Sequence, residues 1–169
     1  IGTDSHKLNA LSIAKKWELY GRYTAKTDVS YTVKYLREGD NKVLAPEKVV
    51  TDQTFDTEVT EQAADVVGYT PDAPSKTMIL DEYNKVLTFS YSANTYDYTV
   101  RHIKQLPDGS YDEANAEVET LSGKFEALAA VTAKDYGSHY PTNDADTKQN
   151  IKIEEGLTID VKYDLDEHT

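Results

Sequence analysis

The chain has 169 residues, with 18 Lys and Arg against 30 Asp and Glu, which gives a formal charge of −12 at neutral pH. This balance argues against nucleic acid as a partner, because phosphates are neutralised by clustered Lys and Arg, and no apolar run approaches the ~20 residues of a membrane-spanning helix. The absence of cysteine excludes disulfides, thiolate metal sites and cysteine nucleophiles, while 13 Tyr, 3 Phe and 1 Trp are typical of a folded chain and not of a disordered acidic tail.

The first 28 residues differ from the rest, because they carry a net charge of +2. Within them, Trp17–Tyr23 alternates in a way that favours a strand. The stretch 5–16 is left open, since Ser5 could cap a helix there. We expect residues 1–28 to be a leader that ends an upstream unit, and the chain to be a fragment of a longer protein.

An internal repeat follows the leader. Tyr31–Leu36 and Tyr98–Ile103 begin alike and alternate as half-buried strands do. Further pairs recur 70 positions apart: Phe55 and Phe125, Pro71 and Pro141, Leu87 and Leu157. The repeat predicts two domains, 29–95 and 96–169, with net charges of −5 and −9.

Each copy is predicted to contain a hairpin, a helical middle segment and two more strands. The expected hairpins pair 31–36 with 48–51 and 98–103 with 116–121. The expected helices span 57–65, where Thr57 could be the N-cap, and the Ala-rich 124–134, for which an irregular helical turn is the alternative. The expected closing strands pair 76–80 with 86–91 and 150–154 with 157–163. This order predicts an α+β fold that is mainly β.

The motifs of the first copy resemble the MucBP family, the mucin-binding-protein repeats of Gram-positive bacterial surface proteins. They are Tyr31–Leu36, Leu44-Ala45-Pro46, Gly68-Tyr69 and the closing strand Val86–Tyr91. The second copy resembles a divergent relative, which lacks the Leu-Ala-Pro element. The resemblance implies two tandem ubiquitin-like β-grasp domains in a wall-attached parent protein, with an adhesive or a stalk role.

Signatures of catalysis are absent from the sequence. There is no Gly-x-Ser-x-Gly, no phosphate-binding loop and no His-Glu-x-x-His. His102 stands where Tyr35 stands in the first copy and is interpreted as a packing residue or a residue on the sheet face. The stretch 143–146 lacks the Gly and the distant Glu of a calcium loop, so we interpret it as a solvated acidic loop. No catalytic residue, metal ligand or cofactor is expected.

Tyrosine is the most informative residue type, because it combines an apolar ring with a hydroxyl. Most tyrosines lie in predicted strands and are expected to pack the sheets. Four aromatic residues follow the predicted helices instead, and we expect any ligand to bind there: Tyr69, Tyr136, His139 and Tyr140. The alternative for the Gly68-Tyr69 position is a plug in the core.

We therefore expect a non-enzymatic, monomeric, extracellular fragment that adheres to a host glycoprotein or glycan such as mucin. The alternative is a structural spacer that presents another binding domain. Because mucins are anionic as well, the charge of this chain would repel them, and contacts with them should be short-range.

Overall fold

The computed structural model describes residues 25–166. This part is mainly β and contains ten strands, two short 3-10 helices and no α-helix. The predicted leader strand 17–23 lies outside the described residues. The described chain divides into two compact units: 25–36 with 42–64 and 73–89, and 37–41 with 65–72 and 90–166.

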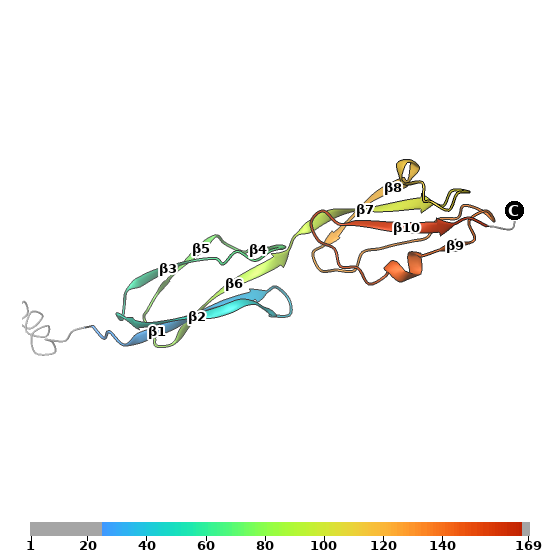
Figure 1. Ribbon diagram of the computed structural model, residues 1–169. Coiled ribbons are helices and arrows are strands. Elements are labelled where there is room, and N and C mark those ends of the chain that lie inside the picture. Colours follow the sequence, from blue (N-terminus) through green and yellow to red (C-terminus); the bar gives the residue numbers. More distant parts are fainter. Residues whose placement is uncertain (1–24, 167–169) are drawn as a thin grey trace, which may run out of the picture. The chain divides into compact units, whose positions relative to one another are not determined.

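The first four-stranded sheet has the order β2-β1-β6-β4 (Figure 1). Its strands are β1 (Val29–Arg37), β2 (Val43–Gln53), β4 (Tyr69–Pro71) and β6 (Lys85–Ala93). β1 and β2 are antiparallel, with Tyr31 opposite Val50 and Val33 opposite Lys48. The predicted hairpin of 31–36 with 48–51 is therefore confirmed.

The alternation read in the sequence sets the buried face of this sheet. Tyr31, Val33 and Tyr35 of β1 are buried, while the residues between them are half-exposed. Phe89 of β6 is fully buried, and its ring stacks on Tyr35 with 5.9 Å between centroids. Successive side chains of a strand point to opposite faces, so every second residue contributes to one core.

The helix expected over 57–65 is wrong, because this segment contains strand β3 (Glu58–Gln62). β3 pairs antiparallel with β5 (Ser75–Ile79) in a separate two-stranded sheet. The buried Glu61 alternates with exposed Thr60 and Gln62, and Val and Thr favour strands over helices. Because β5 pairs with β3, the expected pairing of 76–80 with 86–91 is also wrong.

A buried carboxylate lies on β3. Glu61 is 7% exposed, accepts a hydrogen bond from Tyr31 Oη at 2.5 Å and pairs with Lys48 Nζ at 2.8 Å. Burial alone would raise the pKa of Glu61, but the hydrogen bonds from Lys48 and Tyr31 outweigh it and lower that pKa below its ordinary 4.5. Burial and the bond to Glu61 raise the pKa of Tyr31 to about 12.

Glu61→Gln is expected to lower the free energy of unfolding at pH 7 by about 1 to 2 kcal/mol, since a hydrogen bond to a charged group is lost. Because the folded-state pKa of Glu61 is lowered, its contribution is present above about pH 4.5 and disappears as the pH falls through the folded-state value. Urea unfolding of both proteins between pH 3 and 7 measures this. Asp81→Asn, in an exposed pair with Lys85, is the control; an equal loss in both variants would contradict the prediction.

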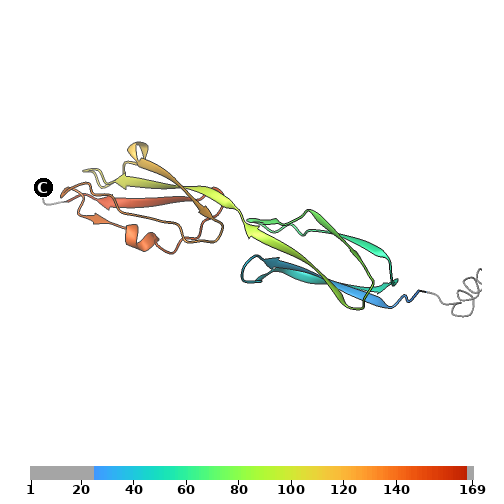
Figure 2. The same cartoon turned by 180° about the vertical axis from the view of Figure 1, so that it is seen from behind.

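The second four-stranded sheet has the order β8-β7-β10-β9, the same relative chain order as the first (Figure 2). Its strands are β7 (Thr95–Lys104), β8 (Glu117–Lys124), β9 (Thr142–Asn143) and β10 (Thr158–Asp164). β7 runs antiparallel to β8 and parallel to β10. Tyr98 lies opposite Leu121 and His102 opposite Glu117, so the predicted hairpin of 98–103 with 116–121 is confirmed.

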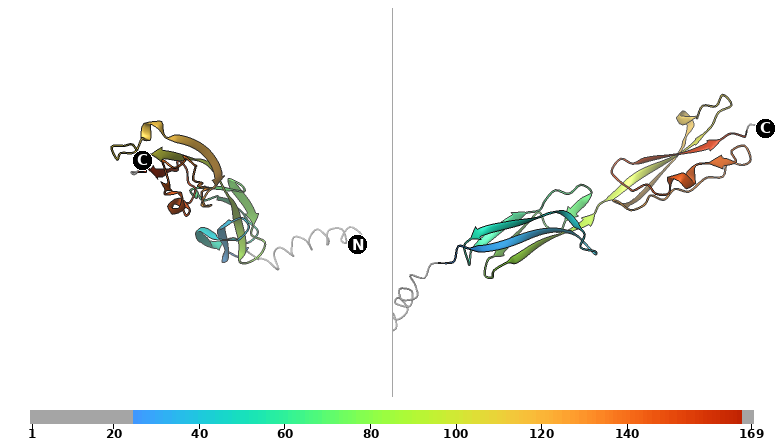
Figure 3. Two further views of the ribbon diagram at one scale, coloured as in Figure 1. Left: turned by 90° about the vertical axis from the view of Figure 1, so that its right-hand side faces the viewer. Right: turned by 60° about the horizontal axis from the view of Figure 1, so that its bottom comes forward.

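The core of this sheet is formed by residues of β7 and β10 together with residues from the connecting segments. Val100, Val161 and Tyr163 are fully buried. The 3-10 helix η1 (Glu113–Asn115) precedes β8, and η2 (Ala145–Lys148) lies against β10 (Figure 3). Ala145 of η2 is buried in the same core.

The helix expected over 124–134 is also wrong, because this segment is extended. Glu126 has a positive φ of 69°, which is incompatible with a continuous helix. After it, buried Ala129 and Val131 flank exposed Ala130, so burial has the period of a strand. Ala129 N–H donates to the carbonyl of Ile151.

The strand expected over 150–154 is likewise not formed. Lys152 makes only an isolated bridge to Leu128, although Ile153 packs in the core. Two non-local contacts outweigh alanine's helix propensity here: backbone bonding between 127–129 and 151–153, and burial of two small apolar side chains. The expected strand at 157–163 is confirmed as β10.

Candidate functional site

A hollow of about 320 Å³ lies in the second unit, beside the segment that connects the extended chain at 129–131 to β9. Its lining residues are Ala133, Lys134, Asp135, Tyr136, Gly137, Tyr140, Pro141 and Asn143. A tight turn shapes it: Asp135 Oδ1 accepts the Gly137 N–H at 2.8 Å, and Tyr140 N–H donates to the Gly137 carbonyl. Gly137 has φ +78°, a value that glycine adopts without strain.

Tyr136 is held in place on several sides. Its ring meets Tyr163 edge-on with 4.8 Å between centroids, and Lys104 Nζ lies 4.2 Å from its centroid. Its hydroxyl donates to the Glu117 carboxylate. Burial and this hydrogen bond raise the pKa of Tyr136, so the phenol remains a proton donor at neutral pH. Tyr136 is therefore a fixed wall of the hollow.

Tyr140 is the less constrained aromatic residue of the hollow. Its half-buried ring lies edge-on to Tyr136, with 6.3 Å between centroids, and Lys104 Nζ is 5.6 Å from its centroid. Within residues 25–166 its hydroxyl has no hydrogen-bond partner. Tyr140 thus offers a ring and a free hydroxyl to a ligand.

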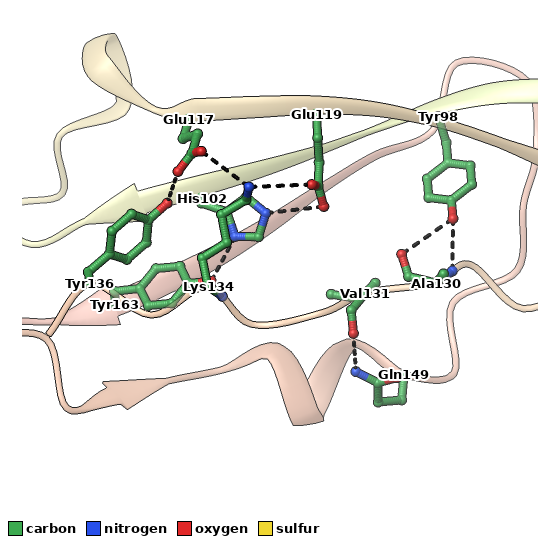
Figure 4. A network of polar contacts seen from close by, with 10 residues as sticks. All are labelled: Tyr98, His102, Glu117, Glu119, Ala130, Val131, Lys134, Tyr136, Gln149 and Tyr163. Carbon is green, nitrogen blue, oxygen red and sulfur yellow. Dashed lines mark hydrogen bonds and ion pairs between the residues drawn. The ribbon is translucent and has the colours of Figure 1, made fainter.

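A polar network anchors the lining segment to the sheet (Figure 4). Lys134 N–H donates to Tyr163 Oη at 2.9 Å, and Tyr163 Oη lies 2.7 Å from His102 Nδ1. The other ring nitrogen of His102 is 3.4 Å from Glu119. This pattern assigns the tautomer in which Tyr163 donates to Nδ1 and Nε2–H donates to Glu119. His102 is 1% exposed, in agreement with the predicted packing role.

Ion pairs add to this anchoring. Lys134 Nζ lies 3.1 Å from Glu117 and 3.7 Å from Glu119, both on β8. The hydrogen bonds from Tyr136 and Lys134 lower the pKa of Glu117. The segment 134–136 is therefore tied to β7, β8 and β10 at the same time, which pre-organises the hollow.

The four residues proposed from sequence occupy different environments. Tyr136 and Tyr140 line the hollow together, whereas His139 is exposed and does not line it. Tyr69 is 8% exposed: its hydroxyl donates to Glu126 at 2.7 Å and its ring meets Phe125 edge-on. This environment is that of a packed side chain, the alternative given above for this position.

Of the polar lining residues, Asp135 has no role in the sequence-based prediction, and Asn143 enters it only as the first residue of the acidic stretch 143–146. The available signal was a pattern of Asp or Asn placed two residues before a backbone amide that it caps, which is a common turn device.

Two residues of the acidic stretch 143–146 accept hydrogen bonds from backbone amides within the fold. Asn143 Oδ1 accepts the Ala145 N–H at 3.0 Å, and Asp144 Oδ1 accepts the Lys162 N–H at 2.6 Å. In the part of the chain that the structure describes, no cluster of three or more His, Cys, Asp or Glu side chains could hold a metal ion.

No helix among residues 25–166 is long and apolar enough to cross a membrane.

Comparison with known proteins gave structural similarities only. No protein-family model and no curated protein matches the chain. A MucBP domain from Lactobacillus acidophilus is 23% identical, covering 39% of this chain and 90% of that domain, with a TM-score of 0.28. Streptococcal High Identity Repeats in Tandem (SHIRT) domains 3-4 from a cell surface protein are 13% identical over 82% of this chain and 98% of that one, with a TM-score of 0.28.

A type 2 repeat of the mucus binding protein MUB from Lactobacillus reuteri is 15% identical over 82% of this chain and 100% of that repeat, with a TM-score of 0.25. Scores this low do not establish a shared fold.

Proposed function

We propose that the chain is a non-enzymatic part of an extracellular, wall-attached surface protein that adheres to a host glycoprotein or glycan through the hollow of its second unit. One observation carries this proposal: Tyr140 presents a ring and a hydroxyl that has no partner among residues 25–166, in a hollow whose other aromatic wall, Tyr136, is fixed by packing. Concave sites that combine aromatic rings with a few polar groups are typical of small-ligand binding.

We further propose that 29–95 and 96–169 are monomeric tandem β-grasp domains, in which extended segments stand where a helix was expected. The common strand order of the two sheets supports this proposal. So do matched buried positions such as Val33 with Val100 and Phe89 with Ile159.

Tyr140→Ala is expected to weaken binding of the full chain to immobilised mucin glycoprotein at least about tenfold, because a contact ring and a hydroxyl are lost. Surface plasmon resonance at two salt concentrations measures the binding. Binding should persist at the higher salt concentration, because an acidic chain is not held to an anionic mucin by long-range charge attraction. Tyr83→Ala, which removes a 47% exposed tyrosine of the first unit, is the matched control. Equal binding by both variants would count against the hollow.

The second candidate function is a structural spacer. The observation in its favour is the involvement of most described tyrosines in packing, Tyr31, Tyr91 and Tyr163 among them. Absence of mucin glycoprotein binding by the wild-type protein at the highest soluble concentration would favour the spacer function over adhesion.

A further inference from the structure

Two polar side chains of the hollow are held in fixed orientations by the backbone. Asp135 Oδ1 accepts the N–H of Gly137 at 2.8 Å, and Asn143 Oδ1 accepts the N–H of Ala145 at 3.0 Å. In both cases one side-chain oxygen binds the amide two residues ahead, which restricts rotation of the whole side chain.

Each of these two side chains has a second polar group that its hydrogen bond to the backbone does not use. Asp135 Oδ2 is a charged acceptor and Asn143 Nδ2 carries two N–H donors. Neither atom has a hydrogen-bond partner within residues 25–166. Both residues line the same hollow as the Tyr140 hydroxyl, so one hollow combines a fixed acceptor, a fixed donor and an aromatic residue.

We infer that Asp135, Asn143 and Tyr140 form a subsite for adjacent hydroxyl groups of a neutral pyranose sugar. A sugar hydroxyl both donates and accepts hydrogen bonds, so Asp135 Oδ2 accepts a hydrogen bond from one hydroxyl while Asn143 Nδ2 donates one to the neighbouring hydroxyl. The Tyr140 ring offers an apolar surface to the C–H groups of the sugar. This inference rests on the adhesive function proposed above and names the ligand class.

Charge selects a neutral sugar over an anionic one. The Asp135 carboxylate in the lining repels a carboxylate or sulfate. The one cation of the lining, Lys134, is already paired with Glu117 and Glu119. Lys104 lies outside the lining and is engaged with the rings of Tyr136 and Tyr140. The free-energy cost of removing a charge from water is offset only when that charge is well paired. An anionic sugar would find no unpaired cation among the lining residues.

The first copy of the repeat does not contain this combination of side chains. The residues seventy positions earlier are Asp65 in place of Asp135, Thr70 in place of Tyr140 and Ala73 in place of Asn143. The acceptor is retained, but the aromatic ring and the amide donor are missing. Sugar binding therefore belongs to the second copy alone.

The test uses two substitutions that preserve the shape of the side chain and its hydrogen bond to the backbone amide. Asp135→Asn and Asn143→Asp each keep Oδ1 on its amide, but the first replaces the acceptor by a donor and the second the donor by an acceptor. Asp108→Asn is the matched control, because Asp108 Oδ1 accepts the Ser110 N–H in the same way on a hairpin turn and does not line the hollow. Thermal unfolding of each variant verifies that the fold is intact.

The probes are methyl galactopyranoside, methyl mannopyranoside, methyl N-acetylglucosaminide and the methyl glycoside of N-acetylneuraminic acid, each titrated into the ¹⁵N-labelled chain of 169 residues. We expect at least one neutral sugar to shift amide resonances of 133–143. Asp135→Asn and Asn143→Asp should each weaken this binding about tenfold or more, and Asp108→Asn should leave it unchanged.

Shifts from the anionic sugar alone, no shift from any sugar, or neutral-sugar binding unaffected by both variants would overturn the subsite. In these cases glycoprotein binding that is lost in Tyr140→Ala would still support the adhesive function. Absence of glycoprotein binding by the wild type would instead overturn both.

Discussion

Replacing Gly68 by Ala is expected to lower the free energy of unfolding by about 3 kcal/mol, from backbone strain of about 1 to 2 kcal/mol plus overpacking. Gly68 has φ +82°, and a Cβ built on it would lie 2.2 Å from the ring of Phe125. That ring cannot withdraw freely, because Tyr69 and Tyr96 both meet it edge-on, at 5.5 and 6.1 Å between centroids. All four residues belong to the second unit.

The two causes can be separated with Gly109→Ala. Gly109 also has a positive φ, +89°, but no atom lies within 4 Å of an added Cβ. It should therefore show the backbone strain alone, about 1 kcal/mol. Urea unfolding followed by circular dichroism gives both values. Equal losses would show that the contact with Phe125 does not matter.

Gly68 also illustrates what the sequence could and could not predict. The Gly68-Tyr69 pair was recognised as a motif, and a core plug was one of the two interpretations considered for it. The close approach of Gly68 to Phe125, 57 positions later in the chain, is a tertiary contact, and no local pattern contains that information.

Strands with strict alternation were predictable, since a period of two is written directly in the sequence. Tyr31, Val33 and Tyr35 are an example, and their burial follows the expected pattern. The middle segments were mispredicted because local propensity was followed there. The alanines of 124–134 favour a helix in isolation, but burial of Ala129 and Val131 and backbone bonding to Ile151 and Ile153 make the segment extended.

The candidate site was predictable only in its residue types. Loop aromatic residues pointed to Tyr136 and Tyr140, which line one hollow. Sequence could not separate them from Tyr69, because the difference between a packed and an available ring depends on Glu126 and Phe125. It also missed Asp135 and placed Asn143 only in an acidic loop, since the turn pattern of Asp or Asn two residues before a backbone amide does not show whether the side chain lines a hollow.

Tyr163→Phe is expected to cost about 2 kcal/mol of folding free energy although it removes a single oxygen atom. Tyr163 is fully buried, and its hydroxyl serves both the Lys134 N–H and His102 Nδ1. The Phe variant leaves a donor and an acceptor without partners in a site that water reaches poorly, and each unsatisfied group costs about 1 to 3 kcal/mol. Tyr111→Phe is the control, because that hydroxyl donates to an exposed carboxylate of Asp164.

The same substitution tests whether the network shapes the hollow. Lys134 N–H lies at the start of the lining segment, so its loss of a partner should free 134–136 from β10 without altering any atom that lines the hollow. Hydrogen exchange of the Lys134 amide should accelerate in Tyr163→Phe and stay unchanged in Tyr111→Phe. Glycoprotein binding should also weaken, because residues 134–136 must then be ordered when the ligand binds, and this ordering reduces the free energy of binding. Unchanged exchange and binding in Tyr163→Phe would mean that the ion pairs of Lys134 with Glu117 and Glu119 suffice to hold the hollow.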